Sequence, residues 1–204
     1  MVKLLLDRGA DVNAQVGGTY GSALAAAASE ALSVGEGMTV VELLLDRGAD
    51  VNAQVGGMYG SALVAAAARS YQENTAVVEL LLDRGADVNA QVGGRYGSAL
   101  VAAAAAGIRN NAAVVGLLLD RGADLNAQVG GEYDSALAAA VASTRPGFTA
   151  RLDLLLERGA DINAEDEEYV SVLQKASMQG SKVADKLLLN LGAMKMPYGV
   201  TDSP

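Results

Sequence analysis

The sequence predicts an all-α protein, a solenoid of stacked helix-turn-helix repeats. The stretch LLLDRGADVNAQVGG at 43–57 recurs almost letter for letter at 80–94 and 117–131. The Arg-Gly-Ala-Asp block inside it begins at Arg8, Arg47, Arg84, Arg121 and Arg158, in steps of 39, 37, 37 and 37 residues. A fixed period of this length indicates a repeat architecture. The hydrophobic residues, 51% of the chain, are mostly Ala, Leu and Val, with one Phe and no Trp, which suits closely packed helices.

The first helix of each unit is expected after a Gly-rich turn that contains a tyrosine. A serine there precedes an Ala-rich run, and its hydroxyl can accept a hydrogen bond from an unpaired N–H group of the first turn. These serines are Ser22, Ser61, Ser98, Ser135 and Ser171. In the last unit Ser171 and Gln174 make a capping box.

The second helix follows a polar stretch of variable length. In one unit it carries Val77, Val78 and three leucines at 80–82, enough apolar residues to bury most of its circumference. It is expected to end before a glycine, because glycine adopts the left-handed conformation just past a helix end without strain. Glycine recurs at this place as Gly9, Gly48, Gly85, Gly122 and Gly159.

Through LLLDRGADVNA and the Ser-x-Leu-x-x-Ala-Ala run, the chain resembles the ankyrin repeat family over residues 1–193. The resemblance implies an ankyrin-type right-handed α-solenoid with short hairpin-like turns. The sequence departs from the family pattern in having SALA, SALV or SVLQ for Thr-Pro-Leu-His, no histidine, and units longer than the usual ~33 residues. The GGxYGSAL variant resembles the ankyrin arrays of fungal NACHT-type receptors.

We expect a single ankyrin-repeat array at 1–193 and a C-terminal tail at 194–204. The array divides into a partial repeat at 1–13, long repeats at about 14–52, 53–89, 90–126 and 127–163, and a capping repeat at 164–193. Residues 1–9 supply only a second helix, so nothing precedes its outer flank of Leu4, Leu5 and Leu6. Ala184 and Asp185 replace the usual valines near the other end, as a polar terminal repeat requires. Either the chain is the C-terminal piece of a longer array, or its exposed N-terminal face pairs with another copy.

Composition excludes several classes of function. The net charge of −9, without clustered basic residues, disfavours a nucleic acid partner. No apolar run approaches the ~18 residues that a membrane span needs, and none resembles a signal peptide. The absence of cysteine favours a reducing compartment, so we expect a cytoplasmic protein without membrane contact.

No catalytic, cofactor or metal site is expected. Histidine and cysteine are absent, and helix capping already explains the serines that could act as nucleophiles. The QGSK stretch at 179–182 lacks the first glycine and the strand of a phosphate loop. The acidic run at 165–168 lacks the spacing and the turn glycine of a calcium loop.

Two further sets of recurring residues have a structural explanation. The Asp and Arg residues beside each glycine, such as Asp46, Arg47 and Asp50, are expected to form ladders of opposite charge along the stack, each exposed pair contributing about 0–1 kcal/mol. The asparagines are expected to bond turn backbone. They are Asn13, Asn52, Asn89, Asn126 and Asn163.

Positions that differ between copies are free of the stacking interface and are therefore candidates for recognition. At x of Gly-Gly-x-Tyr the chain carries Thr19, Met58, Arg95 and Glu132. Drift at an exposed tip and partner recognition explain this row equally well. The resemblance implies that turn tips and first helices form a concave binding surface.

Tyrosines and inter-helix loops supply the remaining candidates for partner binding. One tyrosine per unit, at Tyr20, Tyr59, Tyr96, Tyr133 and Tyr169, either packs on the next repeat or contacts a partner. The loops between helices could form a second rim anchored by Tyr71, Arg109, Arg145 and Phe148, although tolerance of insertions explains them as well.

These observations predict a non-catalytic scaffold that binds another protein through its concave face. The alternative is a self-assembly or sensor module of a larger intracellular receptor, which could form a homo-oligomer through the exposed N-terminal helix. A small-molecule or enzymatic role comes third, since it requires a deep polar pocket.

Residues that recur in the stacking interface form the framework, and positions that differ between copies form the free surface. This division predicts unequal effects of two alanine substitutions. Leu81→Ala, in the middle of the stack, should cost about 2–5 kcal/mol of unfolding free energy. Arg95→Ala, at a turn tip, should change it by no more than about 0.5 kcal/mol. Urea unfolding of both variants measures the difference, and equal costs would contradict the division.

Overall fold

The computed structural model describes residues 1–31, 36–69, 75–106, 112–142 and 148–163. Within these ranges the chain forms α-helices joined by turns, and the extended backbone amounts to an isolated bridge between Gln15 and Ser22. The predicted capping repeat at 164–193, with Ser171, Gln174, Ala184 and Asp185, and the tail at 194–204 lie outside the described residues.

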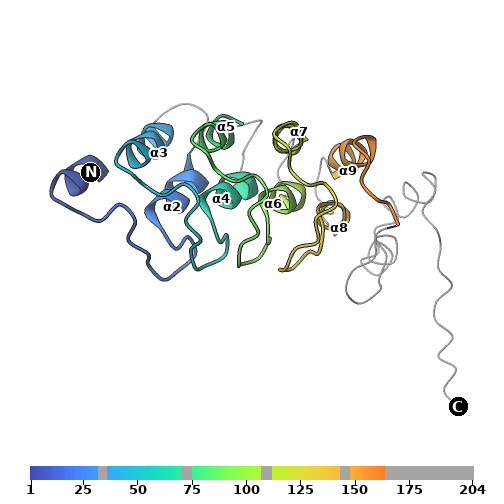
Figure 1. The fold of residues 1–204 in the computed structure, drawn as a ribbon, viewed down its shortest axis with the longest axis horizontal. Helices are drawn as coiled ribbons and strands as arrows, with labels where there is room; N and C mark the ends of the chain where they lie inside the picture. Colours follow the sequence, from blue (N-terminus) through green and yellow to red (C-terminus); the bar gives the residue numbers. More distant parts are fainter. Residues whose placement is uncertain (32–35, 70–74, 107–111, 143–147, 164–204) are drawn as a thin grey trace, which may run out of the picture.

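The helices form two rows. In chain order they are α1 (Val2–Asp7), α2 (Ala23–Glu30), α3 (Glu36–Asp46), α4 (Ala62–Arg69), α5 (Ala76–Asp83), α6 (Ala99–Ala105), α7 (Ala112–Asp120), α8 (Ala136–Ala142) and α9 (Phe148–Glu157). Odd-numbered helices make an outer row and even-numbered helices an inner row, with the long turns projecting beyond the inner row (Figure 1). The predicted all-α repeat solenoid is confirmed.

Each inner helix begins at the serine that the sequence indicates. The Oγ atom of Ser22 accepts a hydrogen bond from the N–H of Ala25 at 3.2 Å, and that of Ser98 accepts one from Val101 at 3.3 Å. Ser61 and Ser135 cap their helices in the same way. The caps fix where the turn ends and the inner helix starts.

The outer helices end at the predicted glycines. Gly85 has φ +89°, and its N–H bonds the carbonyl of Leu82 at 3.0 Å while the N–H of Ala86 bonds the carbonyl of Leu81 at 2.9 Å. This Schellman arrangement satisfies carbonyl groups that the helix leaves open. The chain therefore leaves every outer helix in the same direction.

The core lies between the two rows and between successive units. Inner helix α4 packs against α2 on one side and α6 on the other, and all its residues from Ala62 to Ala68 are buried. Alanine makes this possible because its methyl group allows neighbouring helices to approach closely. Leu44, Leu81, Leu118 and Leu155 of the outer helices are also buried, so the apolar core runs through the stack.

Glycine lets consecutive turns touch through their backbones. A Cβ atom on Gly60, which has φ +74°, would lie 2.1 Å from the carbonyl oxygen of Gly93 in the next turn. Gly21 and Gly97 meet the next turn in the same way. In the fourth described turn this position is Asp134.

The last outer helix departs from the apolar pattern. Arg151 occupies in α9 the position that Val77 and Val114 hold in α5 and α7, and it is fully buried. Burial lowers the pKa of its guanidinium, because the charged form loses hydration. Nothing in the repeat pattern predicts a cation at this place.

The first helix lacks the cover that the others have. The exposed fractions of Leu4 and Leu5 are both 54%. This agrees with the expectation that α1 corresponds to the second helix of a unit and is not covered by a first helix. Leu6 is half-buried. None of the helices in the described ranges is long and apolar enough to cross a membrane.

The same substitution at two glycines should change stability in opposite directions. Gly60→Ala should destabilise the array by at least about 2 kcal/mol, because the new Cβ would meet backbone and the left-handed conformation strains alanine. Gly116→Ala in the middle of α7 should stabilise it by about 0.5–1 kcal/mol, because its Cβ would meet only Leu154 at 3.8 Å. Denaturant unfolding measures both, and a destabilising effect at Gly116 would contradict this account.

Candidate interaction surface

The tips of the long turns are joined by backbone hydrogen bonds. The N–H of Met58 donates to the carbonyl of Thr19 at 2.9 Å, and those of Arg95 and Glu132 donate to the preceding tip, each at 2.8 Å. These four residues, the tip row, hold the variable position of Gly-Gly-x-Tyr. Because backbone atoms make the bonds, any side chain is positioned equally well.

The tip row has a neutral half and a charged half. Thr19 is exposed and Met58 half-buried. Arg95 holds Glu132 in a two-point contact, through Nε and Oε2 and through Nη2 and Oε1, the latter at 3.0 Å. The guanidinium carbon of Arg95 also lies 5.5 Å from the ring centre of Tyr96. Arg95 and Glu132 therefore form one joined pair of opposite charges at the surface.

This ion pair shifts the pKa values of both groups. The hydrogen bond from Arg95 lowers the pKa of the Glu132 carboxyl, and the same bond raises the pKa of the guanidinium. Both side chains are nearly half exposed, so solvent screens the attraction and its contribution to stability stays small.

The tyrosines next to the tip row form a continuous stack. Ring centres lie 5.7 Å apart between Tyr20 and Tyr59, 6.2 Å between Tyr59 and Tyr96, and 6.5 Å between Tyr96 and Tyr133. Only 4% of Tyr59 is exposed, and burial raises the pKa of its hydroxyl. Packing on the tyrosine of the next repeat, one of the two roles expected for these residues, is therefore present for Tyr20, Tyr59 and Tyr96. Tyr169, which follows Tyr133 in the series, lies outside the described residues.

A polar cluster at the ends of two inner helices extends this surface. The hydroxyl of Tyr20 donates to Oε1 of Glu30 at 2.8 Å, and the guanidinium of Arg69 donates to the same oxygen at 3.2 Å. Glu30 and Arg69 are not among the residues that the repeat pattern predicts for this surface. Both stand eight residues after their cap serine, where the next unit has Ala106, so a comparison of copies at this position could have identified them.

The predicted loop anchors cannot be placed on this surface. Tyr71, Arg109 and Arg145 lie outside the described residues. Phe148 begins α9, but its side chain lies outside the described part of the chain.

The two expected ladders are present and join consecutive repeats. Asn52 donates from Nδ2 to the carbonyl of Gly85 at 2.9 Å, and its Oδ1 accepts from the N–H of Asp87 at 2.8 Å. Arg84 contacts Asp46 of the preceding unit at 3.0 Å. Equivalent bonds recur in the other described units, as a structural role requires.

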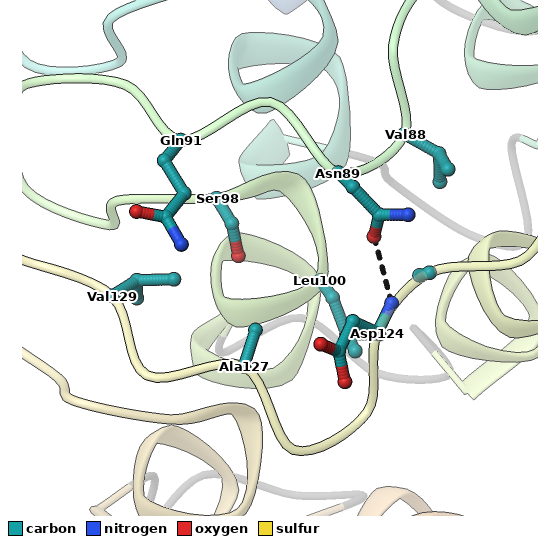
Figure 2. Close-up of a pocket in the computed structure, with 9 residues that line it drawn as sticks. Val88, Asn89, Gln91, Ser98, Leu100, Asp124, Ala127 and Val129 are labelled. Carbon is teal, nitrogen blue, oxygen red and sulfur yellow. Dashed lines mark hydrogen bonds between the residues drawn. The ribbon is translucent and has the colours of Figure 1, made fainter.

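A pocket of about 230 Å³ lies between two successive turns beside α6 (Figure 2). Its polar groups already serve the array: Asn89 accepts from the N–H of Asp124 at 2.7 Å, and Gln91 donates to the carbonyl of Gln128 at 3.4 Å. The hydroxyl of Ser98 caps α6. We therefore do not assign a ligand to this pocket.

The described part of the chain also contains no group of three or more acidic residues close enough together to hold a metal ion. The predicted acidic run at 165–168 lies outside it.

The family model described as "Ankyrin repeats (3 copies)" matches residues 24–129, more than half of the chain. The chain belongs to the ankyrin repeat family. No curated protein matches its sequence. Ankyrin repeats generally act as protein-protein interaction modules and are typically non-catalytic, which agrees with a surface made of turn tips and inner-helix ends in this ankyrin array.

Arg95→Ala should raise the pKa of the Glu132 carboxyl toward its ordinary value, because the main cause of the lowered pKa is the bond from Arg95. A carboxyl whose pKa is lowered on folding stabilises the protein above its unfolded pKa and loses that effect as the pH falls through its folded pKa. The variant should therefore lose this part of the acid sensitivity. NMR titration of Glu132 in both proteins measures the shift, and an unchanged pKa would contradict the assignment.

Proposed function

We propose that the chain is a non-catalytic scaffold that binds another protein through the concave face formed by the tip row and the inner helices. The tip row, Thr19, Met58, Arg95 and Glu132, is the centre of this surface. Tyr20, Tyr59, Tyr96 and Tyr133 support it from beneath. We further propose that Tyr71, Arg109 and Phe148 anchor a second contact rim.

The observation that carries the proposal is the backbone bonding of the tips. Three hydrogen bonds of 2.8–2.9 Å hold four tips in line, while their side chains are a hydroxyl, a thioether, a cation and an anion. The hydrogen bonds that align the tips do not explain this mixture, because they involve no side-chain atom. The backbone positions of the tips are fixed, whereas their side chains differ from unit to unit. Such a surface is suited to recognition, because binding residues are commonly found on loops that a scaffold holds in place.

The surface offers distinct contacts along its length. Met58 supplies an adaptable apolar contact, whereas the Arg95–Glu132 pair and the Tyr20–Glu30–Arg69 cluster supply groups already arranged by hydrogen bonds. Preorganised groups lose little entropy on binding. The net charge of −9 favours approach of a partner with a basic surface, most strongly at low salt.

A second candidate is a self-assembly or sensor module within a larger intracellular receptor. The exposure of Leu4 and Leu5 on α1 favours it, because an open apolar flank of a helix is suited to protein contact.

Substitutions in the neutral half of the tip row should weaken partner binding without unfolding the array. Crosslinking capture from cells with the full chain identifies bound proteins, and titration with each purified protein gives Kd. The double variant Thr19→Arg, Met58→Glu should weaken binding at least about tenfold, equal to about 1.4 kcal/mol. Glu42→Arg on the exposed side of outer helix α3 is the matched control and should bind normally. Unchanged binding by the double variant, or equal loss in the control, would refute the proposal.

A further inference from the structure

The tyrosine stack carries hydroxyl groups that the array itself does not use. In the first unit the hydroxyl of Tyr20 donates to Glu30, ten residues later at the end of α2. The equivalent tyrosines of the next two units are Tyr59 and Tyr96. Their hydroxyls make no hydrogen bond to any residue within the described ranges. Stacking therefore explains the rings but not the hydroxyls, since a phenylalanine ring would stack as well.

The residue ten positions after each tyrosine decides whether the hydroxyl has an acceptor. In the first unit that residue is Glu30. After Tyr59 it is Arg69, whose guanidinium group has only donors and donates to Glu30 of the preceding unit at 3.2 Å. After Tyr96 it is Ala106, which has no polar side chain. The acceptor that the first unit provides is therefore missing from the next two units.

Both hydroxyls remain accessible from the surface. Tyr59 is exposed by only 4%, yet its hydroxyl oxygen is not sealed from solvent, so the hydroxyl lies in the small open part of the residue. Tyr96 is half-buried. Polar groups on nearly buried side chains usually have hydrogen-bond partners. A hydroxyl that lacks one among the described residues is therefore a group that a bound molecule can satisfy.

Glu30 adds an open acceptor at one end of this row. Its Oε1 atom accepts from Tyr20 at 2.8 Å, from Arg69 at 3.2 Å and from Ser29 at 3.4 Å. Its Oε2 atom accepts from no described residue, and its side chain is 61% exposed. Burial raises the pKa of the Tyr59 hydroxyl, and the nearby charge of Glu30 adds to that effect. An acceptor held by several donors thus lies near an unused donor.

The spacing of the row matches an extended polypeptide. Ring centres lie 5.7 Å apart between Tyr20 and Tyr59 and 6.2 Å apart between Tyr59 and Tyr96, with ring planes within 17° of each other. Because the rings are equivalent and nearly parallel, we expect their hydroxyls to repeat at a similar distance. Groups on one side of a β-strand repeat every two residues, about 6.4–6.8 Å. The row therefore fits alternate carbonyl groups of a strand, whereas the carbonyls of an α-helix are already bonded within it.

We propose that the hydroxyls of Tyr59 and Tyr96 and the Oε2 atom of Glu30 bind the backbone of an extended segment of the partner protein. Alternate carbonyl groups of the segment accept from the two hydroxyls, and a backbone N–H donates to Glu30. The segment runs along the stack beside the tip row, which stands one residue before each tyrosine. This inference rests on the proposed function and adds the conformation in which the partner binds.

The probe is a library of short, unstructured peptides of random sequence, selected on the full chain. Selected peptides should lose affinity for the double variant Thr19→Arg, Met58→Glu, which locates them on the proposed surface. For one such peptide, Tyr59→Phe combined with Tyr96→Phe should raise Kd at least about fivefold, because two hydrogen bonds are lost while both rings remain. Unchanged thermal unfolding shows that this variant keeps its fold.

Glu30→Gln tests the acceptor at the end of the row. The amide keeps one oxygen for Tyr20 and Arg69 and places a donor where Oε2 stands, so Kd should rise at least about threefold. Glu42→Gln, the same chemical change on the exposed side of outer helix α3, is the matched control and should leave Kd unchanged. Equal effects of the two substitutions would contradict the role of Glu30.

A second measurement tests the extended backbone of the peptide. Each peptide bond is replaced in turn by an ester, which removes the N–H and weakens the preceding carbonyl as an acceptor. With the parent protein, the loss of affinity should recur at every second bond of the bound stretch. With the protein carrying Tyr59→Phe and Tyr96→Phe, this alternation should disappear. A loss without alternation in the parent would overturn the proposal.

The outcomes separate this inference from the proposed function. Peptides that Thr19→Arg, Met58→Glu weakens but that Tyr59→Phe with Tyr96→Phe leaves unaffected would overturn the backbone contact and preserve the concave binding surface. A selection that yields no binder would likewise overturn the inference. Capture of a folded protein that the tip-row variant releases would then preserve the proposed function. Binding that responds to neither set of substitutions would count against both.

Discussion

Close contact between the backbones of consecutive turns is the constraint on which the rest of the structure depends. The carbonyl of Gly93 occupies the space that a side chain on Gly60 would need, and the tips beyond it are joined by backbone hydrogen bonds. This approach fixes the distance between units on the turn side. Asparagine and arginine ladders fix it elsewhere, so each junction is determined at several points along its length.

The same constraint separates framework from surface. The position of a turn held by its own backbone and by glycine does not depend on which side chain stands at the tip, so residues as different as Met58 and Glu132 occupy equivalent places. The bonds that hold the units are individually small; an exposed ion pair contributes about 0–1 kcal/mol. Their contributions add up along the stack, because each unit contacts its neighbours through bonds that recur from junction to junction.

The sequence alone determined the fold, because an identical junction requires identical residues at a fixed period. Internal repetition identified the inner and outer helices, the serine caps, the terminating glycines such as Gly85, and the Asn and Asp–Arg ladders. It also identified the tip row, since positions that vary between copies are those that stacking leaves free. These features depend on local backbone geometry or on contacts between equivalent residues of neighbouring units. The repeat period identifies both, because it shows which residues are equivalent.

Only the tertiary structure decided how unlike residues pair across units. The two-point contact of Arg95 with Glu132, the convergence of Tyr20 and Arg69 on Glu30, and the burial of Arg151 each involve a side chain that the repeat does not share. Their contacts depend on rotamers and on the exact offset between neighbouring units, which the period does not specify. The sequence therefore predicted which positions are free of the stacking interface, whereas stacking determined which of their charges are exposed singly and which form pairs.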